Sequence, residues 1–377
     1  MKKIFFCLLF FISANIRFVS ADTLVAPVKF FAANNPFIEY TGRIDFSDPL
    51  KPKFWSSGVY VKFRFKGTGC EITVNDEMLY GNSHNYIEIV VDDQKPYRLQ
   101  TTELIDKFKI GGQLANDEHT ITICKDTEAG IGYLEFVGVK CEKLLKPLHR
   151  PKHKMEFIGT SITCAADMDR SLYPCNFGDW YAHHNAYMSY GALTARALKS
   201  DWQIAAISGI GLTNSCCKIP VMPEAYDKVN MRNDSLRWNF NTYQADLVSI
   251  CLGESDGIAA QDSASFCAAY VAFIGDVRRY YPKANIICLS IPTTDTRMNG
   301  SFKKYMVGIA DYMKAHGDNK VYPFTVSKIY AAGCNNHPDL GDHQLIADEL
   351  VDFIQKTFKW GEPQAGKRFL SRIKNGL

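Results

Sequence analysis

Four short blocks in the second half of the sequence carry polar side chains directly after apolar runs. These blocks are 159–163, 208–211, 253–256 and 333–338. The first contains Ser161 and the last contains His337, and a histidine that accepts the proton of a serine hydroxyl makes that serine a nucleophile. If the blocks meet in space, such residues have the types that acyl transfer needs. If they do not meet, Ser161 would only cap a helix and His337 would be an ordinary loop residue.

The elements that must bring these blocks together alternate between strand and helix. Apolar runs predict strands at 155–158, 203–207, 247–252, 286–291 and 321–326. Helical spacing predicts helices at 190–198, 263–280, 302–316 and 344–358. Apolar strands alternating with helices indicate a parallel sheet covered on both faces. Open α/β sheets bind ligands at the carboxyl ends of their strands, so we expect all four blocks at that edge.

The first half of the sequence has the pattern of an all-β domain. Short strands separated by Gly and Asp turns are expected at 61–66, 86–91, 119–123 and 133–137. Such a series is typical of a β-sandwich. The stretch 143–154 holds two prolines and several basic residues and is expected to be a linker. We therefore predict a sandwich over 22–142, a linker over 143–154, an α/β domain over 155–360 and a surface tail over 361–377.

Residues 1–21 are predicted to be a cleaved secretory signal. Lys2 and Lys3 precede an apolar run over 4–12, and small residues follow at 19–21. The run is shorter than a membrane span requires, so we expect a secreted or periplasmic protein. The chain has 43 basic and 40 acidic residues, and the signal removes three basic ones. The balanced remainder gives no electrostatic reason to expect nucleic acid or anionic lipid, and a neutral polysaccharide or a small molecule fits better.

The twelve cysteines bear on disulfides rather than on metal binding. One lies in the signal, so an odd number remains and at least one is free or pairs between chains. Cys164 and Cys175 flank the loop after Ser161 and are candidates to pair in an oxidising compartment; Cys216 and Cys217 are others. No Cys/His spacing matches a structural zinc site, and the adjacent His183 and His184 are expected at the surface.

The second half resembles the SGNH (GDSL-like) hydrolases, which are flavodoxin-like α/β proteins with Ser, Gly, Asn and His on four separate blocks. The resemblance covers about 200 residues and rests mainly on the Ser161 and His337 blocks. It implies that Ser161 attacks an ester and that His337 activates it. It further implies an oxyanion hole made by the N–H groups of Ser161 and Gly209, although Gly209 would also suit a tight turn.

The whole chain resembles carbohydrate esterase family 2 more closely, in which a small jelly-roll-like sandwich precedes the SGNH domain. The similar stretches are 40–44, 65–68, 125–128, 186–191, 337–338 and 343–344. This resemblance implies a serine esterase that removes acetyl or similar small acyl groups from an acylated polysaccharide or oligosaccharide, most often of the plant cell wall. It implies no metal and no organic cofactor.

Two positions depart from the family pattern. Ser255 stands where the oxyanion-hole Asn is expected, and its shorter side chain reaches less far. Losing one oxyanion donor typically costs about 10²–10³ in turnover, and we expect Ser255 to be a partial substitute. Cys334 stands where an Asp usually orients the histidine. The resemblance then implies a Ser161–His337 dyad oriented by a backbone carbonyl. Asp339 is a less favoured local alternative for orienting His337. Asp256 is expected to brace its loop.

Three aromatic residues are candidates for contacts with a sugar ring: Trp180, Tyr187 and Trp238. Each is predicted near the sheet edge, although large aromatic side chains more often pack in the interior. Two alternatives to the carbohydrate esterase stay open. One is an SGNH lipase, thioesterase or peptidoglycan deacetylase, and the other is a carbohydrate-binding protein whose esterase site has decayed, as the changes at Ser255 and Cys334 would allow.

Overall fold

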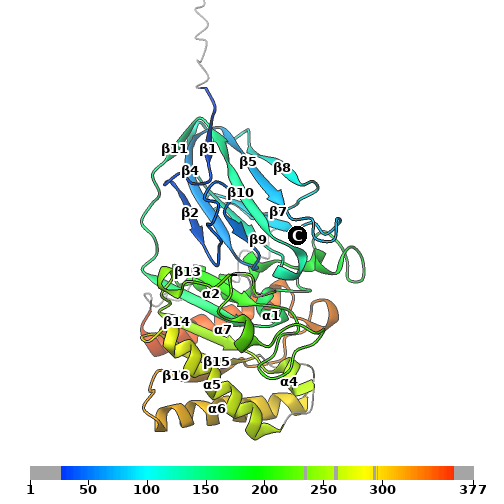
Figure 1. Cartoon of the computed structure of the whole chain (residues 1–377), viewed down its shortest axis with the longest axis vertical. Coiled ribbons are helices and arrows are strands. Elements are labelled where there is room, and N and C mark those ends of the chain that lie inside the picture. Colours follow the sequence, from blue (N-terminus) through cyan, green and yellow to red (C-terminus); the bar gives the residue numbers. More distant parts are fainter. Residues whose placement is uncertain (1–26, 233–235, 259–261, 292–293, 295, 361–377) are drawn as a thin grey trace, which may run out of the picture.

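The protein is described by a computed structural model over residues 27–232, 236–258, 262–291, 294 and 296–360. The segments predicted as signal peptide and tail, 1–21 and 361–377, lie outside the described residues. Two domains are stacked end to end, with a β-sandwich above an α/β domain (Figure 1). This arrangement confirms the predicted fold class of a sandwich followed by a parallel-sheet domain.

The sandwich consists of two antiparallel sheets facing each other. Its strands are β1 (Lys29–Ala32), β2 (Ile38–Thr41), β3 (Lys53–Phe54), β4 (Tyr60–Gly67), β5 (Gly69–Asp76), β6 (Tyr86–Val91), β7 (Tyr97–Gln100), β8 (Ile105–Gly111), β9 (Asp117–Lys125), β10 (Leu134–Cys141) and β11 (Lys143–Leu145), with the short helix η1 (Ala129–Ile131) before β10. One sheet has the order β1-β10-β5-β8 and the other β11-β4-β9-β6-β7. In β4, Phe63 and Phe65 are buried between the sheets while Lys62 and Arg64 are less covered. That alternation is the period-two pattern by which the sequence predicted the strand.

The predicted linker is shorter than expected. Its first residues form β11, which pairs with β4, and its last residues start the first strand of the α/β domain. The stretch between the two strands is 146–152 and contains both prolines. Lys143, Leu144 and Leu145 extend the sandwich sheet because Leu144 is buried in the sandwich core.

The α/β domain has a five-stranded parallel sheet with the order β13-β12-β14-β15-β16. The strands are β12 (His153–Gly159), β13 (Ser200–Ala206), β14 (Leu247–Cys251), β15 (Asn285–Ser290) and β16 (Val321–Thr325). The α-helices are α1 (Ser161–Cys164), α2 (Tyr190–Ala197), α3 (Met222–Ala225), α4 (Glu254–Ile258), α5 (Ser263–Tyr280), α6 (Thr296–Ala315) and α7 (Leu340–Phe358), and the short 3₁₀ helices are η2 (Trp180–His183), η3 (Ala186–Met188), η4 (Phe240–Thr242) and η5 (Cys334–Asn336). This strand order is that of flavodoxin-like sheets, whose ligands bind where the order reverses. The reversal here lies between β12 and β14.

Each face of the parallel sheet is covered by a different set of helices. Side chains of α2 and α7, among them Tyr190 and Leu350, pack with Phe157 on one face. Side chains of α5 and α6, among them Tyr270 and Ile309, pack with Ile158 on the other. Neighbouring strand residues thus serve opposite cores, which is why these strands read as continuous apolar runs in the sequence.

Buried polar and aromatic contacts join the two domains. The Arg43 guanidinium of the sandwich forms a fully buried ion pair with Glu156 of β12 at 2.9 Å. The Tyr60 ring stacks on Trp202 with ring centroids 4.2 Å apart, and its hydroxyl donates to Asp201 Oδ1 at 2.8 Å. Because a buried charge is costly unless it is paired, Arg43 and Glu156 require the domains to remain in contact.

Candidate active site

Ser161 lies on a sharp turn between β12 and α1. At Gly159, the last residue of β12, an added Cβ would stand 2.0 Å from Thr163 Oγ1 and 2.8 Å from the Cys251 carbonyl oxygen. Only glycine fits that position. Because it has no side chain, Thr163 of α1 can pack directly against the end of β12. Ser161 is the first residue of α1, and the first N–H groups of a helix have no acceptor within it. The turn therefore presents the Ser161 hydroxyl and its N–H at the edge of the sheet.

His337 contacts Ser161 although it lies 176 residues later in the sequence. It follows η5, where its N–H donates to the Cys334 carbonyl at 2.9 Å and its carbonyl accepts from the Gly333 N–H at 2.7 Å. Its Nε2 lies 2.9 Å from Ser161 Oγ. The structure thus brings together the two residues predicted as nucleophile and base. A distance of 2.9 Å is a hydrogen bond through which a proton can pass from serine to histidine.

The loop after β13 places Gly209 beside the nucleophile turn. Gly209 has a φ of +80°, and an added Cβ would meet Cys216 Sγ at 2.1 Å, so glycine is required here. Its N–H donates to Thr160 Oγ1 at 3.0 Å. This bond fixes the N–H next to Ser161, and a bound oxyanion would share that N–H with Thr160.

Ser255 is half-buried in the first turn of α4, directly after β14. The next residue, Asp256, is fully buried and accepts hydrogen bonds from the N–H groups of Leu212, Thr213 and Asn214 at 2.8, 2.7 and 3.1 Å. Asp256 therefore braces the Gly209 loop against α4, which confirms its expected bracing part. Ser255 is carried to the same edge of the sheet as Ser161, because β14 is the neighbour of β12.

The sandwich contributes a residue to this edge that the sequence reasoning missed. Glu128, just after β9, is buried, and its Oε2 accepts the Ser208 N–H at 2.7 Å. Its Oε1 lies 3.1 Å from His184 Nε2. Burial acts to raise the pKa of Glu128, but the hydrogen bond and charge of His184 and the bond from Ser208 outweigh it and leave the pKa below its usual value. Glu128 is thus a carboxylate that holds the residue immediately before Gly209.

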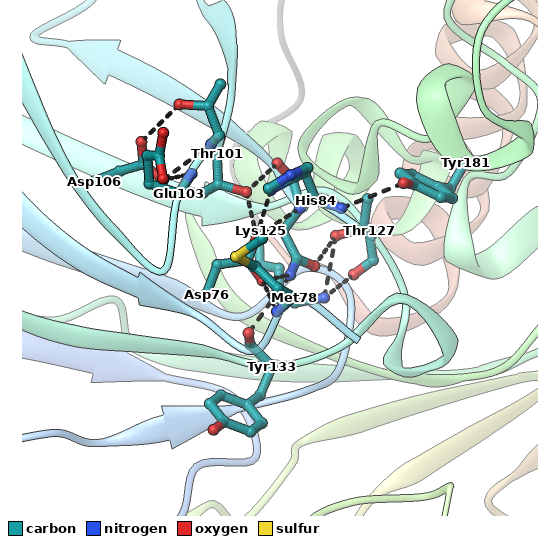
Figure 2. Close-up of polar contacts among 12 residues, drawn as sticks. Asp76, Met78, His84, Thr101, Glu103, Asp106, Lys125, Thr127, Tyr133 and Tyr181 are labelled. Atoms are coloured by element: carbon teal, nitrogen blue, oxygen red, sulfur yellow. Dashed lines mark hydrogen bonds and ion pairs between the residues drawn. The ribbon is translucent and has the colours of Figure 1, made fainter. Parts of the chain in front are cut away.

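A buried polar network holds the turn that carries Glu128 (Figure 2). The Lys125 ammonium donates to the Thr127 carbonyl at 2.6 Å and to the Glu128 carbonyl at 3.3 Å. Thr127 Oγ1 in turn donates to Asn85 Oδ1 at 2.5 Å, and Asn85 Nδ2 donates to Asp76 at 2.7 Å. Burial lowers the pKa of Lys125 to about 7. The stretch 125–128 was noted in the sequence only for its similarity to the family, and nothing in it signals that these side chains are buried.

Two further titratable groups lie near His337. Burial raises the pKa of Glu254, the first residue of α4, while the nearby His337 acts to lower it. Burial lowers the pKa of His343 on α7 to about 3, with His337 contributing in the same direction. His343 Nδ1 accepts the Tyr190 N–H at 3.0 Å, so a neutral imidazole is built into the interior behind the site.

The disulfide at the site differs from the pairing that the sequence suggested. Cys175 pairs with Cys334, not with Cys164. Cys164 is buried in α1 with its thiol 3.7 Å from Glu128 Oε2, because the short helix turns it toward the sandwich. Cys216 and Cys217 are exposed and unpaired. The disulfide joins the loop after α1 to the residue three positions before His337.

His183 and His184 are buried, which corrects their expected surface position. His183 Nε2 lies 3.2 Å from the carbonyls of Tyr173 and Pro174, and His184 binds Glu128. Both therefore hold the loop that precedes α2. Within the described ranges there is no group of three or more His, Cys, Asp or Glu side chains arranged to hold a metal ion.

The three aromatic candidates have different positions. Trp180 is 57% exposed and packs edge-on against His184, so one side of its indole faces solvent near the site. Tyr187 is buried, with the Arg196 guanidinium 3.8 Å from its ring centroid, and is a packing residue. Trp238 is half-buried against a cluster that contains Trp55 and Val229 at the domain junction. Tyr187 and Trp238 were expected to contact a sugar ring at the edge of the sheet. In the structure, both side chains pack in apolar clusters instead.

Comparison with known proteins agrees with this architecture. Residues 40–151 match the family model described as Carbohydrate esterase 2 N-terminal. The chain is 31% identical to a solved family two carbohydrate esterase from Clostridium thermocellum in complex with cellohexaose, with a TM-score of 0.77 over 86% of this chain and 100% of that one. The chain belongs to carbohydrate esterase family 2.

Two curated relatives within this family differ in how much of their length is matched. The cellulase/esterase CelE of Acetivibrio thermocellus is 33% identical over 345 residues, which is 87% of this chain and 40% of CelE. This chain thus spans well under half of CelE. An acetylxylan esterase / glucomannan deacetylase of Cellvibrio japonicus is 25% identical over 82% of this chain and 87% of its own length. Family membership places the chain among the carboxylic ester hydrolases.

Proposed function

We propose that this protein is an esterase that removes acetyl groups from a polysaccharide, with Ser161 as nucleophile and His337 as general base. The observation that carries the proposal is the 2.9 Å contact between Ser161 Oγ and His337 Nε2 at the carboxyl edge of the parallel sheet. The names of the relatives support the substrate class: one is an acetylxylan esterase / glucomannan deacetylase and another is the cellulase/esterase CelE. Acetylated plant cell-wall glycans are therefore the substrates we expect.

In the proposed mechanism, His337 takes the Ser161 proton as the oxygen attacks the acetyl carbonyl. The negative charge that develops on the carbonyl oxygen is stabilised by the N–H groups of Ser161 and Gly209, with the Ser255 hydroxyl as a third donor. His337 then gives the proton to the departing sugar hydroxyl, which leaves an acetyl-serine. Water, deprotonated by the same histidine, attacks this ester, and the histidine returns the proton to the Ser161 oxygen as acetate leaves.

Release of acetate from acetylated glucomannan and acetylated xylan tests the proposal. We expect wild-type enzyme to deacetylate at least one of them and Ser161→Ala to lose at least about 10³-fold in kcat. Ser47→Ala is the matched control, since Ser47 is exposed on a sandwich loop away from the site. Equal rates for wild type and Ser161→Ala would refute the nucleophile assignment. Binding of both glycans without any acetate release would favour the alternative of a binding protein with a decayed site.

A further inference from the structure

The backbone carbonyl that the family resemblance implied as the partner of His337 is not found, because no carbonyl of the described residues accepts a hydrogen bond from its Nδ1. The position that usually carries the orienting Asp is Cys334, and its sulfur is used in the disulfide with Cys175. His337 Nδ1 is buried and, among the described residues, has no hydrogen-bond partner. An imidazole that accepts at Nε2 from serine must carry its proton on Nδ1, and that proton needs a negative or polar group in front of it.

A carboxylate lies in front of this nitrogen. Asp167 Oδ2 is 3.5 Å from His337 Nδ1, and both side chains are only about one-fifth exposed, at 18% and 20%. Asp167 does not come from the histidine block but from the turn that follows α1, six residues after Ser161. Since 3.5 Å is longer than a good hydrogen bond and within ion-pair range, the carboxylate interacts with His337 mainly through its charge in this state.

Two hydrogen bonds hold Asp167 in this place. Asn335 Nδ2 donates to Asp167 Oδ2 at 3.1 Å, and the Cys334 N–H donates to the Asp167 carbonyl at 2.8 Å. Asp167 itself has a φ of +59°, a left-handed conformation that Asp and Asn tolerate better than most residues. The disulfide ties the Cys334 end of this arrangement to the loop that contains Asp167. The backbone is thus shaped to bring one carboxylate to the histidine.

We propose that Asp167 is the positioning residue for His337, so that the site works as Ser161–His337–Asp167 with its carboxylate supplied by the loop next to the nucleophile. This inference rests on the proposed esterase function. Asp167 touches no substrate atom; it fixes the Nδ1–H form of His337 and stabilises the imidazolium that forms when Ser161 attacks. The disulfide at Cys334 then keeps the histidine block against this carboxylate, in place of the Asp that the block lacks.

Other ionisable groups around His337 do not take this part. Glu254 of α4 interacts with His337 electrostatically, but burial raises its pKa and favours its neutral form. His343 of α7 is a buried neutral base with a pKa of about 3. Asp339 uses Oδ1 to accept the Asp342 N–H at the start of α7 and Oδ2 to accept from Arg170 at 3.0 Å. Of the described carboxylates, Asp167 is the one within ion-pair distance of Nδ1.

Two isosteric variants test the proposal. Asp167→Asn removes the charge while keeping a residue that tolerates the left-handed backbone. Asp339→Asn removes the carboxylate that is nearest to His337 in sequence while keeping a good helix cap. For Asp167→Asn we expect kcat on an acetyl ester to fall about 10²-fold or more with KM changed less than about threefold. The acidic limb of its kcat/KM profile should move to lower pH, because a neighbouring negative charge that favours the imidazolium is gone. Asp339→Asn should keep wild-type kinetics.

Several outcomes separate this inference from the function on which it rests. If Ser161→Ala is inactive while Asp167→Asn matches Asp339→Asn, the esterase stands and the inference is overturned. A rate loss with an unmoved pH profile would mean that Asp167 is merely structural and would also overturn it. If Asp167→Asn does not fold, ¹⁵N NMR of histidine-labelled wild type decides. Neutral His337 in the Nδ1–H form supports the proposal, and the Nε2–H form contradicts it.

Discussion

At the scale of single residues, the proposed oxyanion hole departs from the SGNH pattern at one position. Ser255 on α4 stands where the family resemblance leads us to expect an asparagine, and we propose that well-held backbone donors compensate for it. The Gly209 N–H is fixed by Thr160 Oγ1, and Asp256 accepts three successive N–H groups of the same loop. Rigid donors reduce the cost of reorganisation in the transition state, so the site can work with a third donor that reaches less far.

Ser255→Asn should raise kcat on acetyl esters, by up to about tenfold, because a longer amide donor restores a fraction of the roughly 10²–10³ that one oxyanion donor supplies. Initial rates with an activated acetyl ester measure the effect. Ser255→Ala provides the comparison and should be slower than wild type. A Ser255→Asn enzyme no faster than Ser255→Ala would show that this position does not face the oxyanion.

Individual site residues were predictable to different degrees. Ser161, Gly209 and His337 each follow a strand of the parallel sheet, so strand patterns and the order of the blocks were enough to expect them at one edge. Asp167 and Glu128 could not be predicted in this way. Asp167 acts from a turn without regular structure, and Glu128 crosses from the other domain. Such contacts depend on tertiary packing, which no short-range pattern records.

At the scale of elements, the turn over 125–128 makes the sandwich part of the catalytic edge. Glu128 is fully buried, and His184 and the Ser208 N–H are its hydrogen-bond partners that lower its pKa. A buried carboxylate with such partners is expensive to disturb. The Lys125 ammonium holds the same turn through its hydrogen bond to the Thr127 carbonyl (Figure 2).

Glu128→Ala should lower kcat by about tenfold or more with less effect on KM, because the Ser208 N–H loses its acceptor and the Gly209 loop loses its fixed position. Steady-state kinetics and thermal unfolding measure the two consequences. Glu118→Ala is the control, because Glu118 lies on β9, the strand that precedes this turn, and its ion pair with Arg64 is exposed. A Glu128→Ala enzyme that loses stability but keeps its kcat would contradict this role of the turn.

Element boundaries were less predictable than element types. The helix expected at 302–316 begins at Thr296, and the one expected at 344–358 begins at Leu340. Apolar periodicity marks only the turns that pack against the sheet. The first turn of α7 is set instead by its cap, in which Asp339 accepts the Asp342 N–H at 3.0 Å. The first part of the predicted linker joined the sandwich for a similar reason, since one buried leucine was enough to extend β4's sheet.

At the scale of the whole molecule, an ionisable cluster lies where the sandwich meets the α/β domain. Glu88 on β6, Asp126 and Asp169 surround the Arg98 guanidinium, which is 3.4 Å from Asp126 and 3.5 Å from Asp169. Burial, and secondly the charge of Asp126, raise the pKa of Glu88 to about 9. Burial also raises the pKa of Asp126 to about 7. Near neutral pH, Glu88 is therefore a neutral acid at the domain junction.

No helix within the described part of the chain has the length and apolarity to cross a membrane.

Glu88→Gln should become more stable relative to wild type as pH rises from about 5 to 9. The folded pKa of Glu88 lies above its unfolded value, so its contribution is present at low pH and is lost as pH rises toward 9. Relative to the variant, wild type should lose up to about 1.4 kcal/mol of unfolding free energy for each unit by which the pH rises. Denaturant unfolding at several pH values measures this, with Glu71→Gln on β5 as control. A stability difference that does not change with pH would contradict the protonation of Glu88.

The most direct test of the central claim is covalent trapping of the nucleophile. Wild-type protein treated with a fluorophosphonate should gain one adduct by intact mass, and peptide mapping should place it on Ser161. Ser161→Ala should stay unlabelled, and His337→Gln should react far more slowly because its serine has lost the base. An adduct on any other residue, or equal labelling of wild type and Ser161→Ala, would contradict the proposed Ser161–His337 chemistry.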